Sequence, residues 1–249
     1  MTNQYTPAVA STPDIKAADK LRIAEIFASV QGEGKWLGVP SVFVRVSGCN
    51  LRCGWCDTPY ASWEPEGPVM SIDEIVEDVL QYQTSHVVLT GGEPMLFEGI
   101  VPLALRLKNA CKTITIETAG TVYRDLPCNL MSISPKLSGS APARESGWRE
   151  RHEKTRLQHD VLRALIDKYA YQLKFVVNPE VGDEMSEIIE LLKELRVSSN
   201  GVNVMVMAEG RDVDTLRRRE RLLVPICMKN GFRLTPRFQI DLFGDTRAT

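Results

Sequence analysis

Short apolar runs rich in β-branched residues alternate along the chain with longer segments whose apolar positions recur at helical spacing. The short runs predict strands, and they fall at residues 21–27, 41–47, 86–90, 113–117, 130–134, 172–177 and 202–207. The longer segments predict helices over residues 72–80, around 103–107, and over 160–169, 184–195 and 213–229. This alternation is typical of βα units and a mainly parallel sheet. About six units are too few for a closed eightfold barrel, so the pattern predicts an α/β fold with either an incomplete barrel or an open sheet.

Composition narrows the class of protein further. The chain has 249 residues, of which 43% are apolar and 25% charged, and this is enough to bury a globular core. A net charge of −2 offers no general attraction to phosphate, so no nucleic-acid partner is predicted. No apolar run approaches the roughly eighteen residues of a membrane span, so no membrane partner is predicted. Residues 1–20 lack the features of a signal or transit peptide. We therefore expect a disordered lead-in over residues 1–20, a single domain over residues 21–249, and a cytoplasmic location.

Residues 137–158 interrupt the alternation of strands and helices. The first part of this segment is small and polar, and the second part is densely charged. We interpret it as a surface excursion of the single domain, and no motif assigns it a role.

Three of the six cysteines, Cys49, Cys53 and Cys56, lie within eight residues at C-x3-C-x2-C spacing. An odd number of cysteines separated by such short loops does not favour disulfides. Short loops of this kind hold iron–sulfur clusters through their thiolates, and three thiolates on a four-iron cube leave one iron open. Buried thiols or a structural zinc site, which needs a fourth ligand, are the alternatives.

Parallel α/β sheets bind ligands at the carboxyl ends of their strands. That rule brings four segments of this chain to one rim: residues 49–56, 90–94, 117–120 and 134–136. In the second segment, Gly91 and Gly92 allow a ligand to approach the backbone closely, and Glu93 supplies an acceptor for an ammonium group.

The cysteine loop resembles the cluster motif of radical S-adenosylmethionine enzymes, with Trp55 as the aromatic residue before the third cysteine. Residues 91–94, Gly-Gly-Glu-Pro, resemble the GGEP motif of the same superfamily. The resemblance implies an incomplete (β/α)6 barrel, a [4Fe-4S] cluster held by Cys49, Cys53 and Cys56, and S-adenosylmethionine bound to the open iron. A deoxyadenosyl radical then carries the chemistry, so no side chain is expected to be catalytic.

Longer stretches of the sequence resemble the 7-carboxy-7-deazaguanine synthase family. They include residues 25–27, 31–34, 42–45, 48–51 and 56–58, and the resemblance is most specific from Glu25 to Lys136. It implies ring contraction of 6-carboxy-5,6,7,8-tetrahydropterin to 7-carboxy-7-deazaguanine with loss of ammonia, on the route to queuosine and related 7-deazapurines. It also implies a magnesium ion, an electron donor such as flavodoxin or ferredoxin, and a homodimer.

The family's binding residues carry over position by position to this chain. Thr58 matches the threonine that binds magnesium, an ion that prefers oxygen ligands. The positions that match substrate contacts are Gln31, Glu33, Arg45, Thr90 and Gln239, and those that match S-adenosylmethionine contacts are Gly92, Glu93, Glu117, Ser134 and Lys136. Gln239 stands where the family usually has a histidine, and a glutamine carries no charge near neutral pH.

Three further readings stay open from the sequence. The chain could be a radical activating enzyme that acts on a partner protein, or a zinc-stabilised binding module without catalysis. Arg45 lies within an expected strand, so a structural ion pair is an alternative to substrate binding.

Overall fold

The protein is built on a nine-stranded sheet. The computed structural model describes residues 19–198 and 202–249, so nearly all of the expected lead-in over residues 1–20 lies outside the described residues. The strands are β1 (Lys20–Val30), β2 (Pro40–Val46), β3 (Val69–Ser71), β4 (His86–Gly91), β5 (Thr113–Thr118), β6 (Leu130–Ile133), β7 (Tyr171–Val177), β8 (Val204–Ala208) and β9 (Arg233–Leu234), in the spatial order β3-β1-β2-β4-β5-β6-β7-β8-β9.

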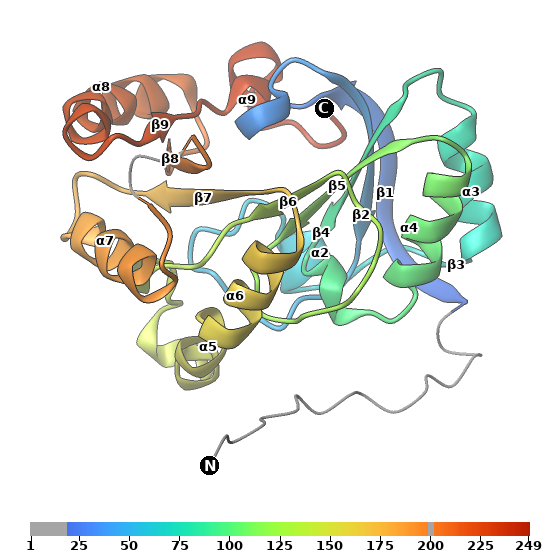
Figure 1. Ribbon diagram of the computed structural model, residues 1–249, viewed down its shortest axis with the longest axis horizontal. Helices are drawn as coiled ribbons and strands as arrows, with labels where there is room; N and C mark the ends of the chain where they lie inside the picture. The colour runs from blue at the N-terminus through green and yellow to red at the C-terminus, as the bar shows by residue number, and fades with distance from the viewer. Residues whose placement is uncertain (1–18, 199–201) are drawn as a thin grey trace.

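Strands β2 and β4–β9 run parallel, whereas β1 pairs antiparallel with both β2 and β3. Figure 1 shows that the sheet curves without closing, which confirms the predicted incomplete barrel.

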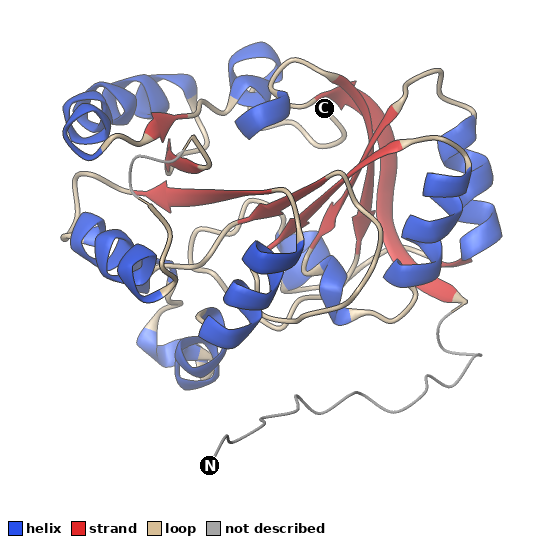
Figure 2. Ribbon diagram, viewed as in Figure 1, coloured by secondary structure: helices blue, strands red, loops and turns tan. Residues whose placement is uncertain are grey.

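Helices surround the curved sheet, most of them on its outer face (Figure 2). They are α2 (Pro59–Ser62), α3 (Ile72–Leu80), α4 (Ile100–Asn109), α5 (Arg149–Arg156), α6 (His159–Lys168), α7 (Glu184–Glu194), α8 (Val213–Asn230) and α9 (Phe238–Phe243), joined by 3-10 turns η1 (Gly34–Trp36), η2 (Pro94–Leu96), η3 (Ser138–Ser140) and η4 (Arg144–Ser146). Local sequence explains where α3 begins, because Ser71 and Glu74 form a reciprocal capping box there. Among the described residues, no helix has both the length and the apolar character needed to cross a bilayer.

Successive strand residues face opposite sides of the sheet, and this alternation separates the core from the interior of the barrel. On β2 and β4, the outward residues Val42, Val44 and Leu89 are fully buried in the main hydrophobic core with residues of the outer helices. The alternate residues on the same strands face the interior. Along the parallel strands these include Phe43, Arg45, Val88, Thr90, Thr115, Glu117, Ser132, Gln172 and Lys174. A polar interior inside an apolar shell gives the protein a binding chamber.

Residues 31–36, which we call the bridging segment, cross the open side of the barrel. The backbone N–H of Lys35 donates to Gln172 on β7 (2.8 Å), and that of Gly34 donates to Thr235 just after β9 (2.7 Å). The backbone N–H of Phe238 returns a bond to the carbonyl of Gly32 (2.9 Å). The gap that strand pairing leaves open is thus closed by loop contacts.

Candidate active site

A cavity of about 480 Å³ lies inside the barrel. Its walls come from the inward faces of the strands, the bridging segment, and the loop that follows β2. Ten of the residues predicted from the sequence line it, and they are Gln31, Glu33, Arg45, Thr58, Thr90, Gly92, Glu117, Ser134, Lys136 and Gln239. The structure therefore brings together positions that are spread over more than two hundred residues of chain.

A smaller cavity of about 110 Å³ adjoins the first and is lined by Cys49, Cys53 and Cys56. Both cavities share Thr58 and Lys136 as wall residues. The three thiols are partly exposed and form no disulfide. Their shared cavity opens towards the larger chamber, so a group held by the thiols would face whatever occupies that chamber.

The thiol cavity fits an iron–sulfur cube better than a single ion. Within residues 19–198 and 202–249, no three Cys, His, Asp or Glu side chains converge closely enough to hold one metal ion. The thiols instead line the walls of a space, and Cys128 and Cys227 lie outside it. The donor set is soft thiolate, which suits iron–sulfur clusters.

Burial of the cysteine loop raises the pKa of Cys49 to about 12 and that of Cys53 to about 11. Both thiols are therefore protonated at neutral pH before metal binds. Because a metal binds the thiolate, uptake of iron must release these protons.

Glycines allow the cysteine loop and the loop after β4 to lie against each other. The backbone N–H of Glu93 donates to the carbonyl of Gly48 (2.9 Å), and that of Gly92 donates to Val46 (3.1 Å). A Cβ on Gly92 would lie 2.2 Å from the Gly48 oxygen, and a Cβ on Gly48, whose φ is +121°, would lie 2.6 Å from the ring of Phe97. These two positions need glycine for this contact.

Glu93 differs from the other predicted residues because it lines neither cavity and is fully buried. Its carboxylate accepts hydrogen bonds from the hydroxyl of Thr118 (2.7 Å) and from the backbone N–H groups of Ala119 (2.8 Å) and Met95 (3.0 Å). Glu93 thereby ties the end of β4 to the end of β5. Its predicted contact with the amino group of S-adenosylmethionine stays a prediction.

Glu117 joins two predicted substrate contacts to each other. One carboxylate oxygen accepts from the amide of Gln31 (3.2 Å), and the other accepts from the hydroxyl of Thr90 (2.9 Å). Side chains from the bridging segment, β4 and β5 therefore form one hydrogen-bonded group at the wall of the chamber.

Glu33, which belongs to the bridging segment, lies at the centre of a cluster of charged side chains. It forms an ion pair with Lys174 of β7, accepts a hydrogen bond from the amide of Gln239 (2.9 Å), and lies 3.4 Å from Nε of Arg237. Burial by itself would raise the pKa of Glu33, but the positive charges of Lys174 and Arg237 lower it to about 2. Glu33 is therefore ionised at neutral pH and can accept hydrogen bonds from a ligand.

Arg237 also forms an ion pair with Asp57, next to the third cysteine, and so connects the cysteine loop to Glu33. Arg45 pairs with Glu25 on β1, and the hydroxyl of Tyr60 donates to the same carboxylate oxygen (2.8 Å). Arg45 thus has the structural ion pair that its place in a strand suggested, and its side chain lines the chamber as well.

Lys136 and Thr58 are placed where the two cavities meet. The ammonium of Lys136 donates to the hydroxyl of Ser134 (2.9 Å) and lies 5.3 Å from the centre of the Trp55 ring. Thr58 occupies the N-cap position of α2, but its side chain makes no capping hydrogen bond. Its hydroxyl lies 4.0 Å from the sulfur of Cys56, and the residue lines both cavities.

Two residues of this site, Lys174 and Arg237, were missed by sequence reasoning. Lys174 is only 6% exposed in the middle of the apolar strand Gln172–Val177. A lysine at an inward position of a buried strand is rare without a partner, and this was a usable signal. Arg237 has no comparable signal, because nothing local shows that it faces Asp57.

The family comparison decides what kind of protein holds this site. A family model described as the Radical SAM superfamily matches residues 43–137. The 7-carboxy-7-deazaguanine synthase of Halobacterium salinarum is 42% identical to this chain over an alignment of 257 positions, which covers 97% of the chain and 99% of the relative. The chain belongs to the 7-carboxy-7-deazaguanine synthase family.

A second relative agrees with membership of this family, and one solved structure has the same fold. The 7-carboxy-7-deazaguanine synthase of Rhodopirellula baltica is 42% identical, and the match covers 96% of this chain and 94% of the relative. The crystal structure of QueE from Escherichia coli superposes with a TM-score of 0.67 at 23% identity, covering 88% of this chain and 94% of that one, which shows a shared fold. The family, the radical SAM class and the incomplete barrel predicted from the sequence are confirmed.

Proposed function

We propose that this enzyme converts 6-carboxy-5,6,7,8-tetrahydropterin to 7-carboxy-7-deazaguanine with loss of ammonia, in 7-deazapurine biosynthesis. The observation that carries the proposal is the pair of adjoining cavities. One is lined by three thiols, the other by polar side chains suited to a carboxylated pterin, and they share a wall.

The cysteine cavity supplies the residues for a [4Fe-4S] cluster. Cys49, Cys53 and Cys56 would hold the cluster, which together with S-adenosylmethionine supplies the radical that abstracts hydrogen. The cofactor's binding residues would be Gly92, Glu93, Glu117, Ser134 and Lys136. Apart from Glu93, these residues line the chamber beside the thiols. Glu93 fixes the loop on which Gly92 lies.

The chamber offers complementary contacts to a carboxylated pterin. Ionised Glu33 can accept from the amino and ring N–H groups of the pterin, and Arg45 can pair with its carboxylate. The rings of Phe27 and Phe43, stacked with 5.1 Å between their centres, form an apolar wall of the same chamber. Gln239 replaces the usual histidine and is hydrogen-bonded to Glu33, so in this chain it orients the carboxylate and supplies no proton.

Magnesium would bind at Thr58, between the thiols and the chamber. The Thr58 hydroxyl makes no capping hydrogen bond to α2. Magnesium can bind a single protein oxygen together with substrate oxygens and water. The nearby carboxylate of Asp57 is engaged by Arg237. The ion would therefore take its other ligands from the substrate and from water.

Three further features complete the proposal on the strength of the family resemblance. The electron donor is a small redox protein such as flavodoxin or ferredoxin, and the enzyme is a homodimer. It acts in the cytoplasm, where reducing conditions keep thiols available for metal.

The deciding experiment is anaerobic incubation of reconstituted protein with S-adenosylmethionine, a reductant, magnesium and the carboxytetrahydropterin. We expect the deazaguanine product in amounts exceeding the enzyme. Cys49→Ala should abolish iron binding and product, whereas Cys128→Ala, outside both cavities, should retain both. A chain that binds iron and cleaves S-adenosylmethionine yet leaves the pterin unchanged would refute the proposed substrate.

A further inference from the structure

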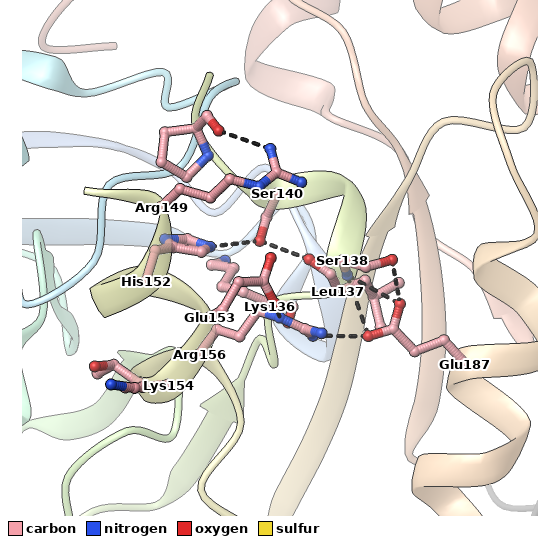
Figure 3. Close-up of polar contacts among 12 residues, drawn as sticks. Lys136, Leu137, Ser138, Ser140, Arg149, His152, Glu153, Lys154, Arg156 and Glu187 are labelled. Carbon is pink, nitrogen blue, oxygen red and sulfur yellow. Dashed lines mark hydrogen bonds and ion pairs between the residues drawn. The ribbon is translucent and has the colours of Figure 1, made fainter. Parts of the chain in front are cut away.

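Residues 137–158 contain buried polar side chains as well as an exposed charged surface. The segment contains η3, η4 and α5, and its Ser140 and His152 side chains are both completely buried. Figure 3 shows the two side chains directed towards each other beneath the charged exterior of α5. A fully buried histidine in a segment of charged residues needs a structural or functional reason.

The hydrogen bonds of His152 define the state of its ring. Nδ1 accepts from the backbone N–H of Arg52 (3.2 Å), so that nitrogen carries no proton. The other ring nitrogen, Nε2, is therefore protonated and donates to the hydroxyl of Ser140 (3.0 Å). The Ser140 hydroxyl donates in turn to the carbonyl of Leu137 (2.6 Å). Every polar atom of this chain of bonds is satisfied with the ring neutral, and burial also lowers the pKa of His152.

Two more contacts join the segment to the cysteine loop. The backbone N–H of Gly54 donates to the carbonyl of Ser140 (2.9 Å). The guanidinium of Arg52 lies 4.2 Å from the centre of the Trp148 ring. The loop is thus held at Arg52 and at Gly54, the residues immediately before and after Cys53.

The segment is itself anchored at its far end. Arg156 pairs with Glu187 of α7 (2.7 Å) and donates to the carbonyl of Lys136 (2.9 Å), while Glu187 also accepts from the backbone of Ser138 (2.9 Å), as Figure 3 shows. Since the anchor includes Lys136, the segment spans from the wall of the larger cavity to the cysteine loop.

We propose that His152 is a positioning residue for the cluster loop: by accepting the Arg52 N–H it fixes the backbone that presents the Cys53 thiol to the cavity. This inference rests on the proposed role of Cys49, Cys53 and Cys56 as cluster ligands. His152 itself lines neither cavity, so it acts through the loop and touches neither cofactor nor substrate.

Two substitutions separate the bonds made by the ring. His152→Asn places an amide oxygen near the position of Nδ1 and retains an acceptor for Arg52. His152→Gln places an amide nitrogen near the position of Nε2 and retains only the bond to Ser140. A positioning role through Arg52 predicts that Asn preserves the cluster environment and that Gln does not.

The matched control is His86, a buried histidine that bonds Ser41 through Nδ1 (2.7 Å) and Thr115 through Nε2 (2.8 Å), and which lines neither cavity. His86→Asn and His86→Gln should lower thermal stability without affecting the cluster.

The readouts are iron and sulfide per chain after anaerobic reconstitution, the electron paramagnetic resonance spectrum of the reduced cluster, and the rate of iron loss to a chelator. For His152→Gln we expect an altered spectrum and iron loss faster by about fivefold, the factor that one neutral hydrogen bond contributes. His152→Asn should stay within about twofold of the parent protein. Far-ultraviolet circular dichroism of each variant reports whether the fold survives.

Should His152→Gln fail to fold, Ser140→Ala provides a second test, because it removes the bond to Nε2 and leaves both the Arg52 bond to Nδ1 and the carbonyl that binds Gly54. Its spectrum and rate of iron loss should stay within about twofold of the parent protein, and a larger change would overturn a role that acts through Arg52. The proposal is overturned if His152→Gln matches the parent protein, if Asn and Gln affect the cluster equally, or if the His86 variants perturb it as much. A parent protein that takes up no iron would instead remove the ligand assignment on which the proposal rests.

Discussion

The buried ion pair between Glu33 and Lys174 offers a direct test of how the bridging segment, which forms the floor of the chamber, is held in place. In Lys174→Met the apolar stem is retained and the ammonium is lost from a position that is 6% exposed. Glu33 then keeps only the guanidinium of Arg237 at 3.4 Å and the amide of Gln239 at 2.9 Å. The substitution therefore leaves a buried carboxylate with weaker compensation.

The pKa of Glu33 bounds the size of the effect. Its partners lower the pKa from 4.5 to about 2 against the opposing effect of burial. At about 1.36 kcal/mol per pKa unit, this preference for the charged form is worth roughly 3 kcal/mol. Breaking a buried pair by removing one partner costs roughly 3–5 kcal/mol. Because two partners remain, we expect Lys174→Met to reduce the free energy of unfolding by about 2 kcal/mol at neutral pH.

The same pair predicts a direction for the pH dependence. The pKa of Glu33 in the folded protein lies below its ordinary value, so its stabilising contribution is complete above about pH 4.5 and is lost as the pH falls towards 2. Lys174→Met raises the pKa of Glu33 in the folded state. The acid loss of stability that Glu33 causes should therefore be smaller in the variant.

Urea unfolding followed by circular dichroism between pH 2 and 8 measures both effects. The control is Arg218→Met, which removes a partner of Glu180 from a side chain that is 57% exposed and should cost less than about 0.5 kcal/mol. In the double variant with Glu33→Gln, the penalty of Lys174→Met should shrink by about 1 kcal/mol or more. A penalty equal to that of the control, or no coupling in the double variant, would refute the reasoning.

Three other predictions concern the two cavities. Thr58→Ala should weaken the stimulation of product formation by magnesium while iron content stays at the parent value, and Thr58→Ser should restore the response; an unchanged magnesium titration would exclude Thr58 as a ligand. Gly32→Ala would place a Cβ 1.8 Å from the amide oxygen of Gln239 and 2.9 Å from its backbone nitrogen. The resulting shift of the floor should raise KM for the pterin by about tenfold with little change in kcat, and equal kinetics would contradict this. Because burial raises the pKa of Cys49 and Cys53 to about 12 and 11, iron uptake by the apoprotein should release protons and become more favourable from pH 7 to 9. A pH indicator in weak buffer measures this release, and its absence would show that the thiols ionise before iron binds.

Much of the site was predictable because its signals are local in sequence. The cysteine spacing and the Gly91–Gly92 pair each identify a loop without knowledge of the fold. The rule that ligands bind at the carboxyl ends of parallel strands then places those loops together. The short apolar runs also predicted seven strands of the sheet, β1, β2 and β4–β8.

The remaining features depend on contacts between distant parts of the chain. Lys174 forms an ion pair with Glu33, and Arg237 forms one with Asp57. No local sequence pattern links positions so far apart. Glu93 is predicted to contact S-adenosylmethionine, and nothing in the sequence indicates that Thr118 donates to its carboxylate. In each case the side chain's partner is decided by tertiary packing.

Residues 137–158 also have a feature that could not be predicted from composition. Its charge density indicated a solvated surface, and most of its charged side chains are indeed exposed. Only the fold shows that one turn of α5 directs His152 inward to Arg52. Composition describes the outer face of such a segment and says nothing of the inner one.

The bridging segment has a consequence for how the enzyme is assembled in the cell. Its partners Gln172, Thr235 and Gln239 lie 137 to 206 residues further along the chain. Synthesis proceeds from the amino terminus at about 5–20 residues per second, so the cysteine loop is complete several seconds before the floor of the chamber can close. During that interval the last strands of the barrel have not been synthesised, so the chamber cannot yet enclose the cysteine loop.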